Sequence, residues 1–374
     1  MARDRELTPS ILLFAKGYLP DDGGIERYSA EVARAYAQNG FRVYVLTQTT
    51  SGPRVARDGK VRVIDLGAKS QLQLLLLFAI YGHRLAKRSR AKFVHATTWR
   101  VAVPAFVMPK RPPLMVTVHG REIFVLPKAL LPLMRLTLKK AEKVAVVSET
   151  IRKAAEATVD SRDWAVVWNG SSFADYEALA LPMRTADDAA KVHIFTLCRL
   201  VERKNILGAV RAIALLVGQG VTNIHYTIAG GGPEREAIEQ LVRERGVQGY
   251  VTLLGRVEDE AIPDLYRKSD IFLHPQIDID GDVEGFGLVI ADAMSLGLCV
   301  IAGKEGGPSD FVIEGQTGLL VDGRNDAEIA NALAKVVRDQ PLRRRIADTA
   351  LDWARRNLSW TAASKKMIEE MGAT

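Results

Sequence analysis

The sequence predicts an α/β protein built from two doubly wound domains. Short runs rich in Val and Ile alternate with longer segments of helical period, a pattern typical of strand–helix–strand units around a parallel sheet. The chain has 374 residues, more than one hydrophobic core usually organises, so two domains are expected. Its composition, 48% hydrophobic and 25% charged, is typical of a soluble globular protein.

Short apolar runs predict seven strands in the first half of the chain and six in the second, with helices between them. Those of the first half cover residues 11–15, 42–47, 61–66, 93–96, 114–118, 144–147 and 165–168. Those of the second half cover residues 192–198, 225–229, 251–254, 271–274, 298–302 and 318–321. After Asp326 the sequence has helical period to its end.

The joint between the domains is predicted within residues 169–190, where Asn-Gly-Ser-Ser, a proline and an acidic, weakly apolar stretch interrupt the pattern. Residues 1–180 then form an N-terminal Rossmann-like domain and residues 181–356 a C-terminal one. The last helix, about residues 357–374, is expected to pack back on the first domain. Ligands of open α/β sheets bind beyond the carboxyl ends of the strands, so we expect a site in an interdomain cleft.

Positive charge is concentrated in the first half. Residues 1–180 contain 28 Lys and Arg against 16 Asp and Glu, a formal charge of +12, whereas the rest of the chain carries −5. A basic stretch at residues 84–92 follows apolar residues 72–80, and a second basic, apolar segment covers residues 128–143. Such segments can lie on an anionic membrane, with a solvated helix face as the alternative. A nucleic-acid partner is not expected, because interleaved aromatic residues and known binding motifs are missing.

The sequence gives no sign of export or membrane insertion. The N-terminus is polar, the first apolar run is too short for a signal peptide, and no uncharged apolar stretch reaches the ~18 residues of a spanning helix. Cys198 and Cys299 lie in apolar runs and resemble neither disulfide partners nor metal ligands. We expect a cytoplasmic protein, and the charge pattern leaves open a peripheral position at the inner face of the cell membrane.

Glycines and a histidine follow several of the predicted strands. Gly23 and Gly24 precede a helix whose first amides can hold a phosphate or carboxylate, although a tight turn is the default interpretation. His119 ends a strand and is positioned to donate a hydrogen bond to a ligand hydroxyl, with an ordinary loop histidine as the alternative. Gly231 lies in a Gly-Gly-Gly-Pro turn that departs from the dinucleotide pattern, and we interpret it as a strand-to-helix turn that lines the cleft.

Two basic residues, Arg199 and Lys204, follow the first strand of the second half. Fixed cations at such a place suit a ligand with concentrated negative charge, such as a diphosphate, which otherwise needs a divalent metal. Their position between a strand and a helix favours this role over ordinary surface basicity.

The most specific motif runs from Glu284 to Asp292, with the sequence Glu-Gly-Phe-Gly-Leu-Val-Ile-Ala-Asp. Glu284 precedes a helix, and Asp292 lies about two turns along it. The two carboxylates are therefore placed to hold different parts of one extended ligand. A phosphate between them would suit the amides at the helix start. These amides belong to Phe286, Gly287, Leu288 and Val289.

Together these motifs, with Gly306-Gly307 and the segment 317–321, resemble the retaining glycosyltransferases of family 4, a GT-B group that includes bacterial mannosyl- and glucosyltransferases. The resemblance covers nearly the whole chain and is strongest over residues 192–322. It implies a GT-B fold and transfer of a hexose from a GDP- or UDP-sugar to a lipid-linked or saccharide acceptor, with retention and with neither cofactor nor metal. The basic first half suits an acceptor of cell-envelope or exopolysaccharide synthesis.

The resemblance also implies roles for the acids and cations of the second half. Glu284 would bind hydroxyls of the donor sugar, and Asp292 would bind ribose hydroxyls. The family usually has Glu where this chain has Asp292, so the reach of the second carboxylate is altered. Arg199 and Lys204 would hold the diphosphate.

In the first half, which would bind the acceptor, His119 would contact the donor sugar and Gly24 would meet donor phosphate or acceptor. Gly231 and residues 286–289 would line the donor site. Two other function classes stay open: a sugar-nucleotide epimerase on the same fold, and a non-catalytic sugar-nucleotide-binding module. The epimerase would release no nucleotide on addition of acceptor, and the module would show no turnover.

The acidic run Asp278, Asp280, Asp282 and Glu284 has two possible metal-binding interpretations. Its Asp-Ile-Asp imitates a D-x-D metal motif, and its alternating acids with Gly281 imitate part of a calcium loop. The calcium pattern needs a glycine at its sixth place and an acid at its twelfth. Counted from Asp278, this chain has Val283 and Val289 at those two places instead. We therefore favour a solvated loop, with a role in admitting acceptor or donor as the alternative.

Overall fold

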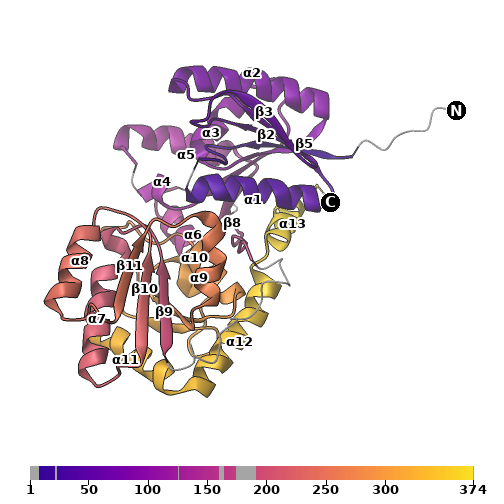
Figure 1. Ribbon diagram of the computed structural model, residues 1–374. Coiled ribbons are helices and arrows are strands. Elements are labelled where there is room, and N and C mark those ends of the chain that lie inside the picture. The colour runs from indigo at the N-terminus through magenta and orange to yellow at the C-terminus, as the bar shows by residue number, and fades with distance from the viewer. Residues whose placement is uncertain (1–7, 22, 125, 160–163, 174–190, 374) are drawn as a thin grey trace. The chain divides into compact units, whose positions relative to one another are not determined.

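The computed structural model describes residues 8–21, 23–124, 126–159, 164–173 and 191–373 (Figure 1). The chain divides into two compact units, residues 1–169 with 360–374 and residues 170–359. We expected the boundary near residue 180, and the contacts place it after Asn169. Most of the predicted joint, residues 174–190, lies outside the described residues.

The first unit contains one eight-stranded sheet. Its strands are β1 (Ser10–Phe14), β2 (Arg42–Thr47), β3 (Arg54–Asp58), β4 (Val61–Asp65), β5 (Ala91–Ala96), β6 (Leu114–Val118), β7 (Lys143–Val146) and β8 (Trp164–Val166). Their order in the sheet is β3-β4-β2-β1-β5-β6-β7-β8. All neighbours are parallel except β3 and β4. Every residue of β1 and β6 is buried, as expected of central parallel strands covered on both faces.

Strand β3 was missed by the sequence analysis. Its sequence, Arg-Val-Ala-Arg-Asp, contains no apolar run, and all five residues are exposed. It lies at the edge of the sheet and pairs antiparallel with β4. Backbone pairing rather than burial therefore defines this strand, and charged residues suit an exposed edge.

The helices of the first unit include the last one of the chain. They are α1 (Gly24–Gln38), α2 (Gln71–Ser89), α3 (Trp99–Ala102), η1 (Val103–Val107), α4 (Arg121–Phe124), η2 (Lys128–Leu130), α5 (Leu131–Lys140), α6 (Glu149–Glu156) and α13 (Trp360–Glu370). Helix α13 packs against α1, where the Asn39 amide donates a hydrogen bond to Ser364 Oγ at 2.7 Å. At the C-terminal end of α13, Lys143 and Glu370 form an ion pair of 3.0 Å.

The second unit contains a six-stranded parallel sheet. Its strands are β9 (Val192–Leu197), β10 (Ile224–Ala229), β11 (Val251–Gly255), β12 (Ile271–His274), β13 (Cys299–Gly303) and β14 (Leu319–Val321), in the order β11-β10-β9-β12-β13-β14. Its helices are η5 (Glu202–Lys204), α7 (Ile206–Gly218), α8 (Arg235–Glu244), η6 (Asp259–Ala261), α9 (Ile262–Arg267), α10 (Leu288–Ser295), η7 (Gly307–Asp310), α11 (Asp326–Arg338) and α12 (Gln340–Asn357). All six predicted strands are present. The prediction of two doubly wound sheets is therefore confirmed.

Each sheet has one place where the chain reverses its direction of travel across the strands. In the second unit this place lies between β9 and β12, and in the first unit between β1 and β5. The loops that leave the carboxyl ends of such strands diverge and leave room for a ligand. Arg199, Lys204 and Glu284 follow β9 and β12, so the sheet order brings their segments together.

Candidate functional site

Glu284 lies between two basic side chains at the reversal point of the second sheet. Its Oε2 accepts a hydrogen bond of 2.8 Å from Arg203 Nη1 and another from the Lys204 ammonium. The Lys204 and Glu284 side chains are only 9% and 12% exposed, which leaves their charges little screened by water. The structure thus brings together Lys204 and Glu284, which the sequence analysis had selected separately.

The charges in this cluster stabilise one another. Burial alone would raise the pKa of Glu284, but Lys204 and Arg203 outweigh that effect and hold the pKa well below its usual range. Burial lowers and the Glu284 carboxylate raises the pKa of Arg203, and the net shift is upward. A fully ionised carboxylate flanked by cations is a weak base and a weak nucleophile, so Glu284 is suited to binding rather than to covalent catalysis.

Arg203 was missed as a site residue, and Arg199 was selected beside Lys204. The Arg199 side chain is exposed and makes no hydrogen bond or ion pair with the residues that the structure describes. The segment Arg-Leu-Val-Glu-Arg-Lys contains three cations. Arg203 and Lys204, which lie in the short helix η5, contact Glu284 in this structure, and Arg199, which precedes that helix, does not.

Two buried polar side chains continue from Lys204 into the unit. His274 Nε2 lies 3.3 Å from the Lys204 nitrogen, and His274 Nδ1 lies 2.9 Å from Gln276 Oε1. The Gln276 amide donates hydrogen bonds to the carbonyl oxygens of Gly303 and Glu305 at 2.7 and 3.0 Å. Burial and the Lys204 charge lower the pKa of His274 to about 4, so His274 is neutral at physiological pH.

The loop that carries Glu284 is held by glycines of a neighbouring loop. The Gly307 amide donates to the Glu284 carbonyl at 2.8 Å. A Cβ on Gly306 would lie 2.7 Å from that same oxygen, and a Cβ on Gly307 would lie 2.1 Å from the Gly285 carbonyl oxygen. Only glycine allows this approach. The Gly306-Gly307 pair, part of the family pattern, thus fixes the path of the backbone at Glu284.

Helix α10 begins directly after this loop. Gly287 is its N-cap residue, with a φ of 90°, and Leu288 and Val289 form its first turn. Amides of a first turn have no acceptor within their own helix and can donate to an anion. Phe286 is buried against Phe311, with ring centroids 4.8 Å apart, so its side chain supports the loop. The predicted contact of residues 286–289 with a donor stays a prediction.

Asp292 lies within α10 and is 4% exposed. Its Oδ1 accepts hydrogen bonds from Ser171 Oγ at 2.8 Å and from the Ser172 amide at 2.9 Å. In this structure one carboxylate oxygen therefore holds the first residues of the second unit. The predicted role of Asp292 on a ribose stays a prediction, and the contact with Ser171 is one that the sequence analysis did not foresee.

The three consecutive glycines after β10 form the turn that the sequence predicted. Gly230 donates to the Gly255 carbonyl at 2.7 Å, and Gly231 accepts from Leu200 at 2.9 Å. A Cβ on Gly230 would lie 1.8 Å from the Cys198 carbonyl oxygen, so another residue would displace the loop after β9. A Cβ on Gly231 itself would meet only the Arg256 side chain, at 3.3 Å, which leaves this position open to a ligand.

In the first unit, His119 follows β6 as expected. Its Nε2 lies 3.0 Å from the Thr97 carbonyl oxygen, which can only accept, so Nε2 carries the proton. Burial lowers the pKa of His119, although Glu122 and the Thr97 carbonyl oppose this shift. In the neutral ring Nδ1 is then an acceptor. We predicted that His119 donates to a hydroxyl; the tautomer instead allows it to accept one.

Gly24, the other first-unit site residue, is the first residue of α1 and is exposed. A Cβ at this position would have nothing within 4 Å. Packing within the described residues thus gives no reason for glycine here, which is compatible with the predicted approach of a ligand.

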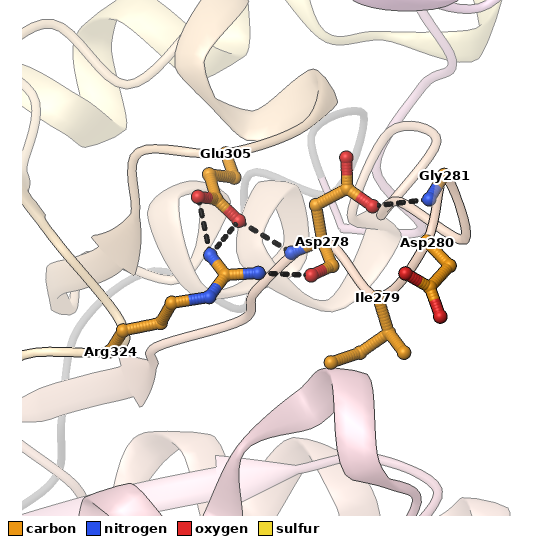
Figure 2. Close-up of a pocket in the computed structure, with 6 residues that line it drawn as sticks. All are labelled: Asp278, Ile279, Asp280, Gly281, Glu305 and Arg324. Atoms are coloured by element: carbon orange, nitrogen blue, oxygen red, sulfur yellow. Dashed lines mark hydrogen bonds and ion pairs between the residues drawn. The ribbon is translucent and has the colours of Figure 1, made fainter.

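The acidic loop after β12 lines an open pocket, in which the side chains of Arg324 and Glu305 form an ion pair (Figure 2). Its lining residues are Asp278, Ile279, Asp280, Gly281, Glu305 and Arg324. Arg324 Nη1 lies 2.5 and 2.6 Å from the two Glu305 oxygens, and its Nη2 donates to the Asp278 carbonyl. The Asp278 amide in turn donates to Glu305 at 2.5 Å. These contacts fix the backbone at Asp278, while Asp280 is exposed, as expected of a solvated loop.

Among the residues that the structure describes, no group of three or more His, Cys, Asp or Glu side chains is arranged so that it could hold a metal ion. Among the described helices, none is both long and apolar enough to cross a membrane.

Two family models match consecutive parts of the chain. Residues 22–172 match the model described as Glycosyltransferase Family 4, and residues 185–353 match the model described as Glycosyl transferases group 1. The chain is 26% identical over 372 residues to the GDP-mannose-dependent alpha-(1-6)-phosphatidylinositol monomannoside mannosyltransferase of Mycolicibacterium smegmatis, covering 94% of this chain and 88% of that protein. The enzyme of the same name from Mycobacterium tuberculosis H37Rv is 31% identical over 178 residues. That match spans 47% of this chain and just under half, 46%, of the relative.

Solved structures share the fold at low sequence identity. Sucrose-phosphate synthase from Thermosynechococcus elongatus superposes with a TM-score of 0.79 at 21% identity, covering 96% of this chain and 98% of that one. Anabaena Alr3699/HepE, solved in complex with UDP and glucose, gives a TM-score of 0.75 at 20% identity and covers 98% of this chain and all of the other. The predicted GT-B architecture is confirmed by these matches.

Proposed function

The chain belongs to the family 4, group 1 glycosyltransferases, and from this membership we propose that it is a retaining, metal-independent hexosyltransferase. Its donor would be a GDP- or UDP-sugar and its acceptor a lipid-linked or saccharide hydroxyl. An epimerase on the same fold receives no support from either family model.

The proposal depends above all on one observation, the pairing of Arg203 and Lys204 with Glu284 at the reversal point of the second sheet. A nucleoside diphosphate brings at least two negative charges, which the two cations would neutralise in place of a metal. In this structure Glu284 pairs with both cations. A diphosphate would compete for them and leave the carboxylate to accept hydrogen bonds from sugar hydroxyls.

The chemistry would proceed on one face of the sugar. The bond between the anomeric carbon and the β-phosphate oxygen breaks, and its electron pair leaves with the diphosphate. The acceptor hydroxyl oxygen forms the new bond from the same face, and its proton passes to the departing phosphate oxygen. Negative charge grows on that oxygen in the transition state, so the fixed Lys204 ammonium would stabilise the transition state more than the ground state.

The first unit would contribute to sugar and acceptor recognition. Neutral His119 holds its Nδ1 lone pair available through the Nε2 contact with Thr97, which suits it to accept from a hydroxyl. GDP-mannose is the first donor to test, because the relative matched over nearly its whole length is named as GDP-mannose-dependent.

We further propose that the first unit binds anionic membrane through α2, near a lipid-linked acceptor. The α2 surface consists of five exposed apolar side chains, namely Leu72, Leu75, Leu76, Ile80 and Tyr81. Only Phe78, Gly82 and Ala86 of this helix are buried. Three basic residues, Arg84, Lys87 and Arg88, follow along the same helix, and Arg90 comes directly after it; all four are exposed. Apolar insertion and attraction to anionic lipid would then act together.

The decisive experiment is a panel of GDP- and UDP-sugars, each assayed for nucleotide release with and without candidate acceptors and for protection against thermal unfolding. Acceptor-dependent nucleotide release, with the product retaining the anomeric configuration, is the expected result. Interconversion of sugar nucleotides without an acceptor would support an epimerase instead. Protection by a sugar nucleotide without any turnover, across a broad set of acceptors, would favour the non-catalytic binding module.

A further inference from the structure

A buried hydrogen-bonded chain of side chains links the Lys204 ammonium to the backbone at the end of β13 and just beyond it. His274 and Gln276 form its two links, and they are 0% and 1% exposed. This hydrogen-bonded chain ends at the carbonyl oxygens of Gly303 and Glu305, beside the loop that carries Gly306 and Gly307. His274 contacts the site through the Lys204 ammonium, so the influence of both residues on the reaction would pass through Lys204.

The groups at the two ends of this hydrogen-bonded chain determine where its protons lie, because the backbone carbonyls at one end only accept and the Lys204 ammonium at the other only donates. Gln276 Nε2 lies beside two backbone carbonyls, which only accept, so this atom is the amide nitrogen and Oε1 is the acceptor. Oε1 accepts from the Gly303 amide at 3.2 Å and must also accept from His274 Nδ1. His274 therefore carries its proton on Nδ1. Its Nε2 lone pair faces the Lys204 ammonium, which only donates.

The contact with His274 restricts the Lys204 side chain, which has the more flexible stem of the two cations that contact Glu284. A lysine ammonium has three N–H donors on a flexible four-carbon stem. One donor of Lys204 is directed to Glu284 and a second to His274. If a diphosphate took the place of Glu284, the His274 contact would remain to hold the ammonium.

We propose that His274 and Gln276 are positioning residues of the transfer reaction, which hold Lys204 toward the departing diphosphate by keeping a neutral imidazole in the Nδ1–H form. This inference rests on the proposed glycosyl transfer. The charged groups that face His274 are Lys204, Arg203 and Glu284. Protonation of His274 would remove the acceptor and place a third cation in the cluster.

An ordinary buried histidine is the competing explanation, because His274 also stacks on Phe272 with ring centroids 6.2 Å apart. That explanation predicts a loss of stability on substitution but no specific change in pH dependence. Positioning of Lys204 predicts a change in turnover, and it predicts that a carboxylate at position 276 makes turnover sensitive to acid.

The test compares Gln276→Glu and His274→Phe with wild type under the donor and acceptor that give transfer. A carboxylate next to Nδ1 favours the imidazolium, so Gln276→Glu should move the acidic limb of the turnover profile upward by roughly one pH unit or more. His274→Phe keeps the stacked ring but removes the acceptor. Its turnover should fall by about tenfold, less than the loss expected for removal of the cation itself, with a smaller change in donor KM.

Two matched controls separate these effects from charge and packing in general. Gln219→Glu adds the same charge on an exposed residue after α7. His225→Phe makes the same change at a histidine of the same sheet that bonds only Thr252 among the described side chains. Both should retain the wild-type pH profile. Wild-type turnover and an unshifted acidic limb in soluble Gln276→Glu and His274→Phe would overturn the inference.

A measurement on the wild-type protein covers the case in which the variants do not fold. The chain has six histidines, so a sample labelled with ¹⁵N at histidine gives few ring signals. His274 should be protonated on Nδ1 alone at neutral pH, and a proton on its Nε2 would overturn the inference without reference to activity. Absence of transfer by wild type with every donor would instead overturn the proposed function, and the positioning role with it.

Discussion

The hydroxyl of Ser171 donates a 2.8 Å hydrogen bond to the carboxylate of Asp292, a residue 121 positions further along the chain. This contact joins the first residues of the second unit to the helix that follows the Glu284 loop. The same carboxylate oxygen also accepts from the Ser172 amide. Asp292 is therefore a structural acceptor in the second unit.

Asp292→Ala should destabilise the second unit, because it leaves the Ser171 hydroxyl and the Ser172 amide without their acceptor. The expected loss is about 1–3 kcal/mol, measured by urea unfolding. Asp292→Asn is the matched control, since its amide oxygen can still accept both bonds. If Asp292 also binds ribose, Asn should keep the stability but weaken nucleotide binding. Equal stability of the Ala variant and wild type would contradict the structural role.

Glu284→Gln should separate nucleotide binding from transfer. The substitution removes the negative charge that occupies Arg203 and Lys204, so a nucleoside diphosphate should bind at least as tightly as to wild type. Turnover should fall by roughly tenfold or more, because the carboxylate no longer binds the donor sugar. Asp282→Asn is the control, as its carboxylate lies 3.6 Å from Arg203. Calorimetric titration measures nucleoside diphosphate binding. If Glu284→Gln lost this binding as well as turnover, the result would contradict the idea that Glu284 and the diphosphate compete for the two cations.

Lys204→Ala should lower turnover by about 10²–10³, the usual cost of removing one electrostatic donor. Arg203→Ala should follow in the same direction, since Arg203 shares the Glu284 contact. Arg199→Ala tests whether the exposed cation joins the site when a donor is bound. Turnover at saturating donor ranks the three variants. An unchanged rate for Lys204→Ala would refute its assigned role.

The protein should lose stability as the pH falls below the usual histidine range. Burial, with a smaller effect of His119, lowers the pKa of His95 to about 3, and the side chain bonds Tyr36 and Thr117 in the core of the first unit. Between about pH 6.5 and pH 3 the unfolded chain therefore binds a proton that the folded chain does not. The free energy of unfolding should fall toward acid by up to about 1.4 kcal/mol per pH unit for this residue.

Urea unfolding of wild type and His95→Gln at a series of pH values checks this expectation. The variant should unfold more easily at neutral pH but show the shallower dependence on pH. The difference between the two slopes isolates His95 from the other titrating groups. Parallel slopes would mean that His95 is protonated in the folded protein.

Flotation with anionic liposomes tests the α2 surface. Wild type should float at low salt and less at high salt, because screening weakens the attraction of the basic residues. Leu72 and Leu76 are 69% and 57% exposed, so the double variant Leu72→Ser/Leu76→Ser should reduce binding by roughly tenfold or more. Neutral liposomes should bind wild type less well than anionic ones.

The control is Leu215→Ser/Leu254→Ser, a pair of exposed apolar residues in the second unit, 44% and 42% exposed. It should float as wild type does. Equal losses in both double variants, or wild type that does not float at low salt, would remove the membrane proposal.

Most of the fold could be predicted from local pattern, because parallel central strands are buried on both faces and appear as short apolar runs. The same dependence on apolar runs explains why β3 was not predicted, since an exposed, charged edge strand has no apolar run. The motif from Glu284 to Asp292 also stood out locally, where glycines and two carboxylates meet the start of a helix. The sequence alone thus determined the two α/β sheets and the loop that holds the candidate site.

Tertiary structure decided which side chains contact one another within that site. Lys204 and Glu284 are 80 positions apart and meet because β9 and β12 are neighbours in the sheet. The choice of Arg203 over Arg199, the His274 tautomer and the Ser171 contact of Asp292 all depend on side-chain directions set by that packing. Local periodicity carries no information about contacts between distant segments, so the sequence could name the chemical groups but not their partners.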